Sequence, residues 1–316
     1  MTIGHKELVA IALPSGFYAY SPEIQSLASA FDPKLFRKMS DIAADRLQVY
    51  LSDRSTRGLA LVDPRVLLQA ARSLMTAERD AIAAFDEKRL AAIIDLYVKT
   101  GIQVHSPSSM GRQFSGVVPL AGVTDFVSSM VSQPSSFYEA GQLPNVAERI
   151  MADELSRFIG WDAARSAMVT TSGGSLANLT ALLAARNMAF PGIWDRGECD
   201  GPGRPAIAVS EEVHYSVPRA AGVLGIGETQ IVRLPVNRDQ QIRADQVGDA
   251  LAAAERRGLT VFCLVASAGT TATGAFDPIC GSYSACVGWW SPAREDRPIL
   301  GRLTRRVGLI DRKSVV

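Results

Sequence analysis

Short apolar runs of strand length alternate with amphipathic stretches of helix length through the second half of the chain. This alternation constrains the fold more than any other feature. The predicted strands are residues 167–171, 206–210, 230–236 and 261–267. The predicted helices that follow the first three strands are residues 176–190, 216–227 and 243–258. Repeated strand–helix units favour a mostly parallel sheet with helices on both faces, so we predict an α/β fold.

The region before residue 100 predicts helices instead. Apolar side chains recur on one helical face between Leu35 and Leu51, and Pro64 stands where the first turn of a second helix tolerates it. The helices predicted outside the strand–helix region are residues 35–51, 66–85, 87–99 and 145–161. Residues 105–122 are rich in Gly, Pro and Ser and predict an irregular loop. The predicted division is an N-terminal helical segment (1–100), a large α/β domain (101–279) and a tail (280–316).

The composition argues against several classes of function. Of the 316 residues, 47% are hydrophobic and 21% are charged, and the net charge of +1 gives no indication of nucleic acid or a membrane surface as partner. No apolar run approaches the ~20 residues that span a bilayer, and the N-terminus lacks a signal-peptide pattern. The four cysteines form no CxxC pair, so we predict free thiols, no metal site and a cytoplasmic protein.

Ligands of parallel sheets bind at the carboxyl ends of the strands, which directs attention to the loops at those ends. After the first predicted strand come Ser172, Gly173, Gly174 and Ser175, and then a helix. Paired glycines allow a close approach of the backbone, and a helix N-terminus presents N–H groups to an anion. The loop therefore predicts a phosphate seat, although a plain serine-capped turn remains an equal alternative from this loop alone.

His214 follows the second predicted strand and is one of only three histidines in the chain. A histidine at this place can lay its ring on a flat aromatic ligand or transfer a proton. The alternative is a structural histidine that caps the next helix.

The loop after the fourth predicted strand carries Thr270, Thr271 and Asp277. The two threonine hydroxyls can reach a ligand that lies over the sheet edge. The alternative is a threonine-rich turn in which Asp277 caps the next segment. Each of the three loops is a weak signal alone, but their order and spacing together are specific.

With these three loops in order, the sequence resembles the group II pyridoxal-phosphate (PLP) decarboxylases, which include aromatic-amino-acid, glutamate and diaminobutyrate decarboxylases. The segments that carry the resemblance are TSGGSLANLTALLAAR, VSEEVHYSVPRAAGVLGIG and SAGTTATGAFDPI. The resemblance covers roughly residues 61–279. It implies an incomplete large domain of the aspartate aminotransferase-like type (fold type I) with an N-terminal helical segment, PLP as cofactor, an amino acid as substrate and a homodimer.

The family's functional residues carry over onto matching positions. The resemblance assigns Gly174 and Ser175 to the PLP phosphate, His214 to stacking on the pyridine ring and to proton transfer, and Thr271 to the cofactor and substrate site. Asp277 matches an acidic residue that supports the cofactor site, and His105 matches a histidine near the substrate-entry loop. The predicted catalytic residues are thus His214 and Thr271.

Two groups that the family requires have no match. The resemblance places two of the family's residues after residue 279: the lysine that forms the Schiff base, and the aspartate of an HVDA strand that pairs with the pyridine. In this chain no HVDA sequence follows residue 279, and the only lysine there is Lys313. Arginines and two adjacent tryptophans crowd the same region. We hypothesise that the chain is truncated or out of frame from about Cys280 and is an impaired carboxy-lyase.

Two alternatives stay open. The chain could be another fold type I PLP enzyme, or a non-catalytic remnant that acts as a partner subunit. The substrate is also open among acidic, aromatic and diamino acids, with a weak preference for an aliphatic or diamino acid.

Overall fold

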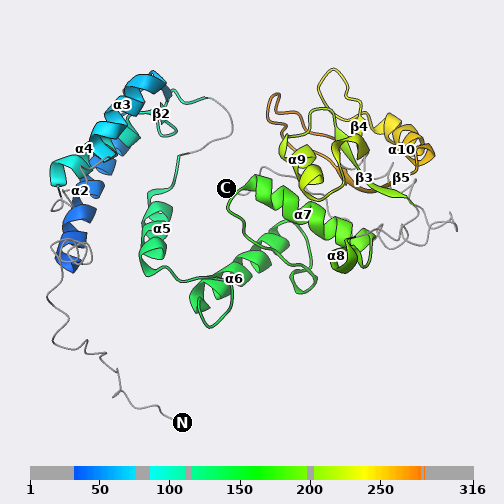
Figure 1. The fold of residues 1–316 in the computed structure, drawn as a ribbon, viewed down its shortest axis with the longest axis horizontal. Coiled ribbons are helices and arrows are strands. Elements are labelled where there is room, and N and C mark those ends of the chain that lie inside the picture. The colour runs from blue at the N-terminus through cyan, green and yellow to red at the C-terminus, as the bar shows by residue number, and fades with distance from the viewer. Residues whose placement is uncertain (1–31, 76–85, 111–115, 198–202, 279–280, 282–316) are drawn as a thin grey trace, which may run out of the picture. The chain divides into compact units, whose positions relative to one another are not determined.

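A computed structural model describes residues 32–75, 86–110, 116–197, 203–278 and 281. The chain forms two compact units, residues 1–130 and 131–316, and each is considered by itself (Figure 1). The division falls after Met130, whereas the sequence placed the start of the large domain at residue 101; the domain boundaries remain a prediction. None of the helices in the described ranges is long and apolar enough to cross a membrane.

The first unit is helical, as predicted. Its elements are α2 (Pro33–Ser52), β1 (Leu59–Ala60), α3 (Pro64–Met75), α4 (Glu87–Val98), β2 (Gly101–Ile102) and α5 (Pro119–Val131). The side chain of Asp32 accepts a hydrogen bond from the Lys34 N–H at the start of α2, and Asp86 does the same for α4. The last ten residues of the predicted helix 66–85 lie outside the described residues.

Helix α5 corrects the last four residues of the predicted loop 105–122, whereas residues 105–110 and 116–118 form no helix or strand, as predicted. Pro119 occupies the first position of α5, where its missing N–H costs nothing and its fixed φ suits a helix. The high Gly, Pro and Ser content around it concealed the helix, because these residues also favour loops.

The second unit contains the strand–helix alternation. Its elements are α6 (Gln142–Phe158), η1 (Ala163–Arg165), α7 (Gly174–Ala189), α8 (Ile193–Arg196), β3 (Arg204–Ser210), α9 (Ser216–Val223), η2 (Glu228–Gln230), β4 (Ile231–Leu234), η3 (Ala244–Gln246), α10 (Val247–Arg256) and β5 (Leu259–Val265). Three predicted strands and the helices between them are confirmed within a few residues at each end.

The described strands of this unit form a parallel sheet in the order β4-β3-β5. Ser210 pairs with Leu234, and Val209 pairs with Val265, so the carboxyl ends of all three strands meet at one edge. The chain passes from β3 to β4 on one side of β3, and then from β4 to β5 on the other side of β3. The strand order therefore reverses at β3, and in open α/β sheets ligands bind at such a reversal.

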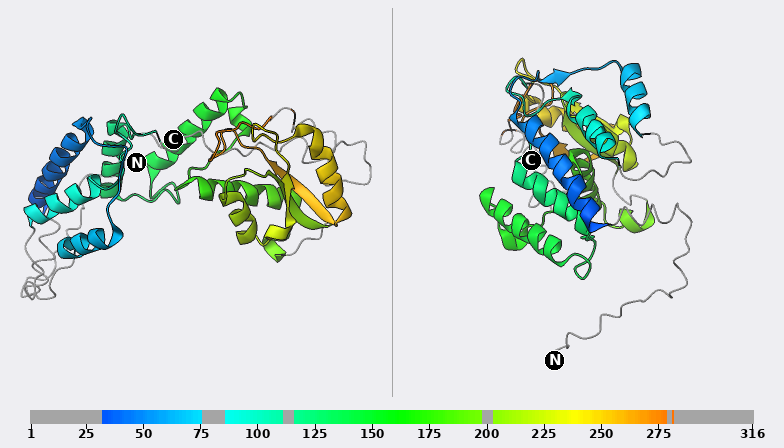
Figure 2. Two further views of the ribbon diagram at one scale, coloured as in Figure 1. Left: turned by 90° about the horizontal axis from the view of Figure 1, so that it is seen from above. Right: turned by 90° about the vertical axis from the view of Figure 1, so that its left-hand side faces the viewer.

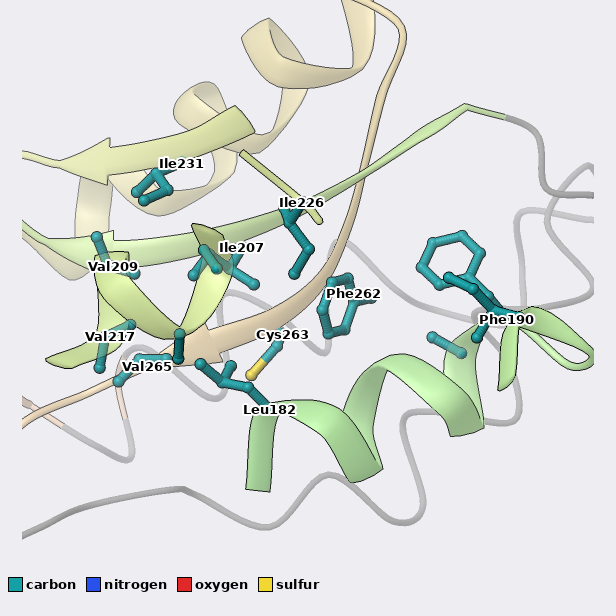
Figure 3. Packing of buried hydrophobic residues seen from close by; sticks show 14 residues of the cluster. Leu182, Phe190, Ile207, Val209, Val217, Ile226, Ile231, Phe262, Cys263 and Val265 are labelled. Atoms are coloured by element: carbon teal, nitrogen blue, oxygen red, sulfur yellow. The ribbon is translucent and has the colours of Figure 1, made fainter. Parts of the chain in front are cut away.

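Helices cover both faces of the sheet, as predicted. On one face, Ile207 and Val209 pack with Leu182 of α7 and Val217 of α9 (Figure 3). On the other face, the opposite side chains of β3 pack against α10. Figure 2 shows α10 on one side of the sheet and α7 and α9 on the other.

One extra residue in β5 changes which of its side chains face each layer. Ala206 pairs with Val261, but the next residue, Ile207, pairs with Cys263, so Phe262 is a bulge without a partner in β3. Val261 faces α10, and Cys263 lies with Phe262 on the α7 side. Phe262 is fully buried and makes an edge-on contact with Phe190, with 5.7 Å between the ring centroids.

The predicted strand 167–171 is wrong, because these residues form no strand. A short apolar run becomes a strand only where a neighbouring strand supplies hydrogen bonds, and no described strand pairs with this run. Val169 is 61% exposed, so burial does not hold the segment in a sheet either.

Candidate functional site

The predicted phosphate seat is the N-terminus of α7. Gly174 is the first residue of this helix, and the carbonyl of Gly173 accepts the first helical hydrogen bonds, from the N–H groups of Leu176 and Ala177. The N–H groups of Gly174 and Ser175 precede the first intrahelical bonds, so a helix of this geometry offers them to an external acceptor. A Cβ placed on Gly173 would meet no atom of the chain within 4 Å, so the space beside it is open. The seat fits an anionic group.

Helix α6 holds the segment that leads into this seat. Both the N–H and the hydroxyl of Thr170 donate to Glu148 Oε1, each at 2.7 Å. These hydrogen bonds lower the pKa of the Glu148 carboxyl, the backbone contact most strongly. The Thr171 hydroxyl then donates to the Gly173 carbonyl at 3.0 Å. The approach to α7 is thus fixed by side chains in place of a strand ladder.

His214 follows the carboxyl end of β3 and is joined to α7 by a buried hydrogen-bond network. His214 Nδ1 lies 2.8 Å from Ser216 Oγ, and Asn178 Nδ2 donates to the same Ser216 Oγ at 2.8 Å. His214 Nδ1 also accepts from the Ser216 N–H at 3.3 Å, which is the first N–H of α9. The predicted alternative, that His214 caps the next helix, therefore describes a real contact as well.

A tight turn follows the carboxyl end of β5. The N–H groups of Gly269 and Thr270 both donate to the Ala275 carbonyl. Thr270 is buried, and its Oγ1 accepts from the Ala275 N–H at 3.0 Å and lies 2.7 Å from Thr273 Oγ1. Thr270 therefore builds the turn. Thr271, which the sequence assigned to the cofactor and substrate site, is the half-buried residue that the turn presents next.

Asp277 is buried, and its carboxylate binds backbone. Oδ2 accepts from the Ser267 N–H at 2.7 Å, and Oδ1 accepts from the Ile242 N–H at 2.8 Å. The carboxylate thus joins the loop after β5 to the segment between β4 and α10. This geometry suits the supporting role that the resemblance implies; contact of Asp277 with a cofactor remains a prediction.

His105 belongs to the other unit. Its ring contacts Tyr50 edge-on, with 5.6 Å between the centroids, and a Cβ on Gly116 would come within 2.7 Å of its Nδ1. The role of His105 in substrate entry remains a prediction. Lys313 lies outside the described residues.

The second unit brings together the predicted residues that follow its strands. Gly174 and Ser175 begin the helix that is linked to His214 through Ser216, and the turns carrying His214 and Thr271 follow the adjacent strands β3 and β5. Sequence reasoning missed Glu148, Asn178 and Ser216. Only the spacing of His214 and Ser216 hinted at the network, since a side chain two residues before a helix start often bonds to it.

No group of three or more His, Cys, Asp or Glu suited to a metal ion occurs in the described parts of the chain.

These features define an α/β protein of fold type I, built on a parallel sheet with its candidate site at the carboxyl edge. The crystal structure of mouse CSAD shares this fold, with a TM-score of 0.72 over 86% of this chain and 59% of that one, at 21% identity. The chain belongs to the pyridoxal-dependent decarboxylase family, whose conserved domain matches residues 80–289 and whose cofactor is PLP.

Curated relatives agree with this assignment. A glutamate decarboxylase-like protein of Gibberella zeae is 32% identical over 199 residues, which are 62% of this chain and 38% of that protein. The L-2,4-diaminobutyrate decarboxylase of Acinetobacter baumannii is 27% identical over 206 residues, which are 61% of this chain and 40% of that protein. The chain thus matches about two-fifths of the length of these relatives.

Proposed function

We propose that this chain carries the cofactor-binding half of a PLP-dependent carboxy-lyase that acts on an L-amino acid. The observation that supports this most is the network from Asn178 through Ser216 to His214. It joins a helix N-terminus suited to phosphate with a ring suited to stacking.

The residues present fit the cofactor. The N–H groups of Gly174 and Ser175 would hold the phosphate, because the helix N-terminus carries partial positive charge. The ring of His214 would lie on the pyridine, and Thr271 would border the cofactor and the substrate. When bound, PLP supplies the electron sink that makes loss of carbon dioxide feasible. The chain's own residues bind it, orient it and place a proton donor beside it.

We propose further that the 316 residues alone are impaired in catalysis. No lysine or aspartate stands where the family's resemblance requires the Schiff base and the pyridine partner, and Lys313 is the only lysine after residue 279. A carboxylate beside the pyridine nitrogen stabilises its protonated form, and its loss weakens the electron sink. Residues from about Cys280 onward are, in this proposal, out of frame or foreign to the family.

The second candidate function is a non-catalytic PLP-binding remnant or partner subunit. In that case the phosphate seat and His214 would hold the cofactor without a covalent bond. Another fold type I PLP enzyme is the third candidate, which the similarity to curated decarboxylases disfavours. We expect a homodimer in the cytoplasm, and an aliphatic or diamino acid as substrate, in keeping with the diaminobutyrate decarboxylase among the relatives.

The test is a titration of the purified 316-residue chain with PLP and, in parallel, with pyridoxal, which lacks the phosphate. We expect PLP to bind at least about tenfold more tightly, a difference of ~1.4 kcal/mol, because the α7 N-terminus acts on the phosphate alone. Equal affinities would refute the phosphate seat.

The same sample tests impairment. Borohydride reduction and release of carbon dioxide from L-glutamate, L-2,4-diaminobutyrate and aromatic amino acids should both be negative. A borohydride-fixed cofactor that disappears in Lys313→Ala would show instead that the chain forms its own covalent bond with PLP.

A further inference from the structure

Three polar side chains of the second unit form a hydrogen-bonded line, in which Asn178 and Ser216 are buried and His214 is half-buried. Asn178 lies one turn into α7, Ser216 is the first residue of α9, and His214 ends the loop after β3. Asn178 and Ser216 are 3% and 2% exposed, so water cannot replace the bonds between them. Such a line persists only if every donor meets an acceptor.

The hydrogens along this line can be assigned from chemistry. The amide nitrogen of Asn178 carries hydrogens and no acceptor site, so Ser216 Oγ accepts from it. The Ser216 hydroxyl lies 2.8 Å from His214 Nδ1, and the direction of this hydrogen bond depends on the tautomer of the ring. The Ser216 N–H donates to the same nitrogen at 3.3 Å. An N–H group directed at Nδ1 requires a lone pair on that nitrogen, so both contacts suit a neutral ring without a proton on Nδ1, in which the Ser216 hydroxyl is the second donor.

We propose that Ser216, itself oriented by Asn178, is a positioning residue that holds neutral His214 in the tautomer with its proton on Nε2. This rests on the proposed function, in which His214 stacks on the cofactor, and it adds which ring atom bears the proton. Because a neutral imidazole has one N–H, fixing Nδ1 as the acceptor makes Nε2 the only nitrogen that can donate.

The arrangement also links two parts of the site. Asn178 belongs to the helix whose first turn forms the phosphate seat, and His214 is the ring proposed to stack on the same ligand. A shift of α7 along its axis would therefore move the Ser216 hydroxyl and disturb the His214 ring. One hydrogen-bond network thus connects the helix that forms the phosphate seat with the His214 ring.

The test reads the tautomer directly, by nitrogen NMR of the full chain with labelled histidine, without cofactor. The chain has only three histidines, and His5→Gln, His105→Gln and His214→Gln variants assign their signals. The spectra are recorded at about pH 8.5, two units above the ordinary imidazole pKa of about 6.5. We expect His214 to show an unprotonated Nδ1 and a protonated Nε2.

Ser216→Ala should produce a mixture of the two tautomers, because the shorter of the two contacts to Nδ1 is lost. Ser216→Thr keeps the hydroxyl and should restore a single form. Ser210→Ala is the matched control, since Ser210 is a buried serine of the same strand–loop region whose Oγ accepts from the Glu212 N–H. It should leave the His214 signals unchanged.

A wild-type ring with its proton on Nδ1 would overturn the proposal, whether or not Ser216→Ala folds. An unchanged single tautomer in a folded Ser216→Ala would overturn it as well. The PLP titration separates the positioning role of Ser216 from the proposed function. If the His214 ring carries its proton on Nε2 but the chain fails to bind PLP, the positioning role is supported and the cofactor site is refuted. PLP binding by a chain with an Nδ1–H ring supports the cofactor site and refutes the positioning role.

Discussion

Thr170 donates two hydrogen bonds, from its N–H and from its hydroxyl, to the same carboxylate oxygen of Glu148. Thr170 lies shortly before Gly174, the first residue of α7, so Glu148 fixes the approach to the phosphate seat although it lies on another helix.

This contact should make the approach to α7 sensitive to acid. The folded-state pKa of Glu148 is lowered by the Thr170 bonds, so their stabilising effect is complete above the unfolded pKa of about 4.3 and is lost as the pH falls through the lowered folded value. The protection factor of the Thr170 amide, which is its intrinsic exchange rate divided by the observed rate at the same pH, should therefore fall as the pH is lowered. Glu148→Gln keeps an acceptor without a titrating group, so its Thr170 protection factor should not change with pH in this range. If the protection factor still fell in acid in Glu148→Gln, a group other than Glu148 would be responsible.

Replacing Asp277 should lower the stability of the chain. Asp277→Ala leaves the N–H groups of Ser267 and Ile242 without their acceptor, and each unmade buried bond costs about 1–3 kcal/mol. Asp277→Asn keeps one acceptor oxygen and should lose less. Urea denaturation measures both. If Asp277→Asn weakened PLP binding with unchanged stability, the residue would act on the cofactor instead of the loop.

Truncating Phe262 should be among the most damaging core changes. Its side chain is fully buried and packs edge-on against Phe190, and removal of a buried aromatic ring costs about 3–5 kcal/mol. We expect Phe262→Ala to unfold at markedly lower urea concentration than the wild type, and Phe262→Leu to fall between them. Leu176→Ala, at an exposed position of α7, is the control and should change little.

Ser175→Ala should weaken PLP binding and leave pyridoxal binding unchanged. The Ser175 hydroxyl belongs to the first turn of α7, beside the proposed phosphate, and a hydrogen bond to a charged group contributes about 1.5–3 kcal/mol, or roughly tenfold or more in affinity. Parallel titrations with the two ligands check it. An equal loss for both ligands would mean that Ser175 acts on the ring portion.

The sequence was most informative where periodicity and flanking signals agreed. The strand 206–210 and the helix after it combine an apolar run, a turn and an amphipathic pattern, and both were confirmed. The strand predicted at 167–171 failed because pairing depends on a neighbour that no local pattern reveals. Helix α5 was missed because Pro119 is as common in loops as at the start of a helix.

The candidate site could be predicted only as separate loops. The positions of Gly174, His214 and Thr271 after apolar runs, and their resemblance to family motifs, single them out. The pairing of Asn178 with Ser216 bridges 38 residues of chain, and it depends on how α7 and α9 pack. No spacing rule connects an asparagine inside one helix with a serine at the start of another.

The bulge at Phe262 sets the phase of the remaining residues of β5. Side chains in a strand alternate between faces, so a shift of one residue in the pairing exchanges the two sets. If Phe262 took an ordinary paired position, Leu264 would turn toward α7, and Val265 toward α10. The turn that carries Thr271 follows the end of β5. The extra residue at Phe262 therefore determines which side chains face each helical layer at the end of β5, before the threonine turn.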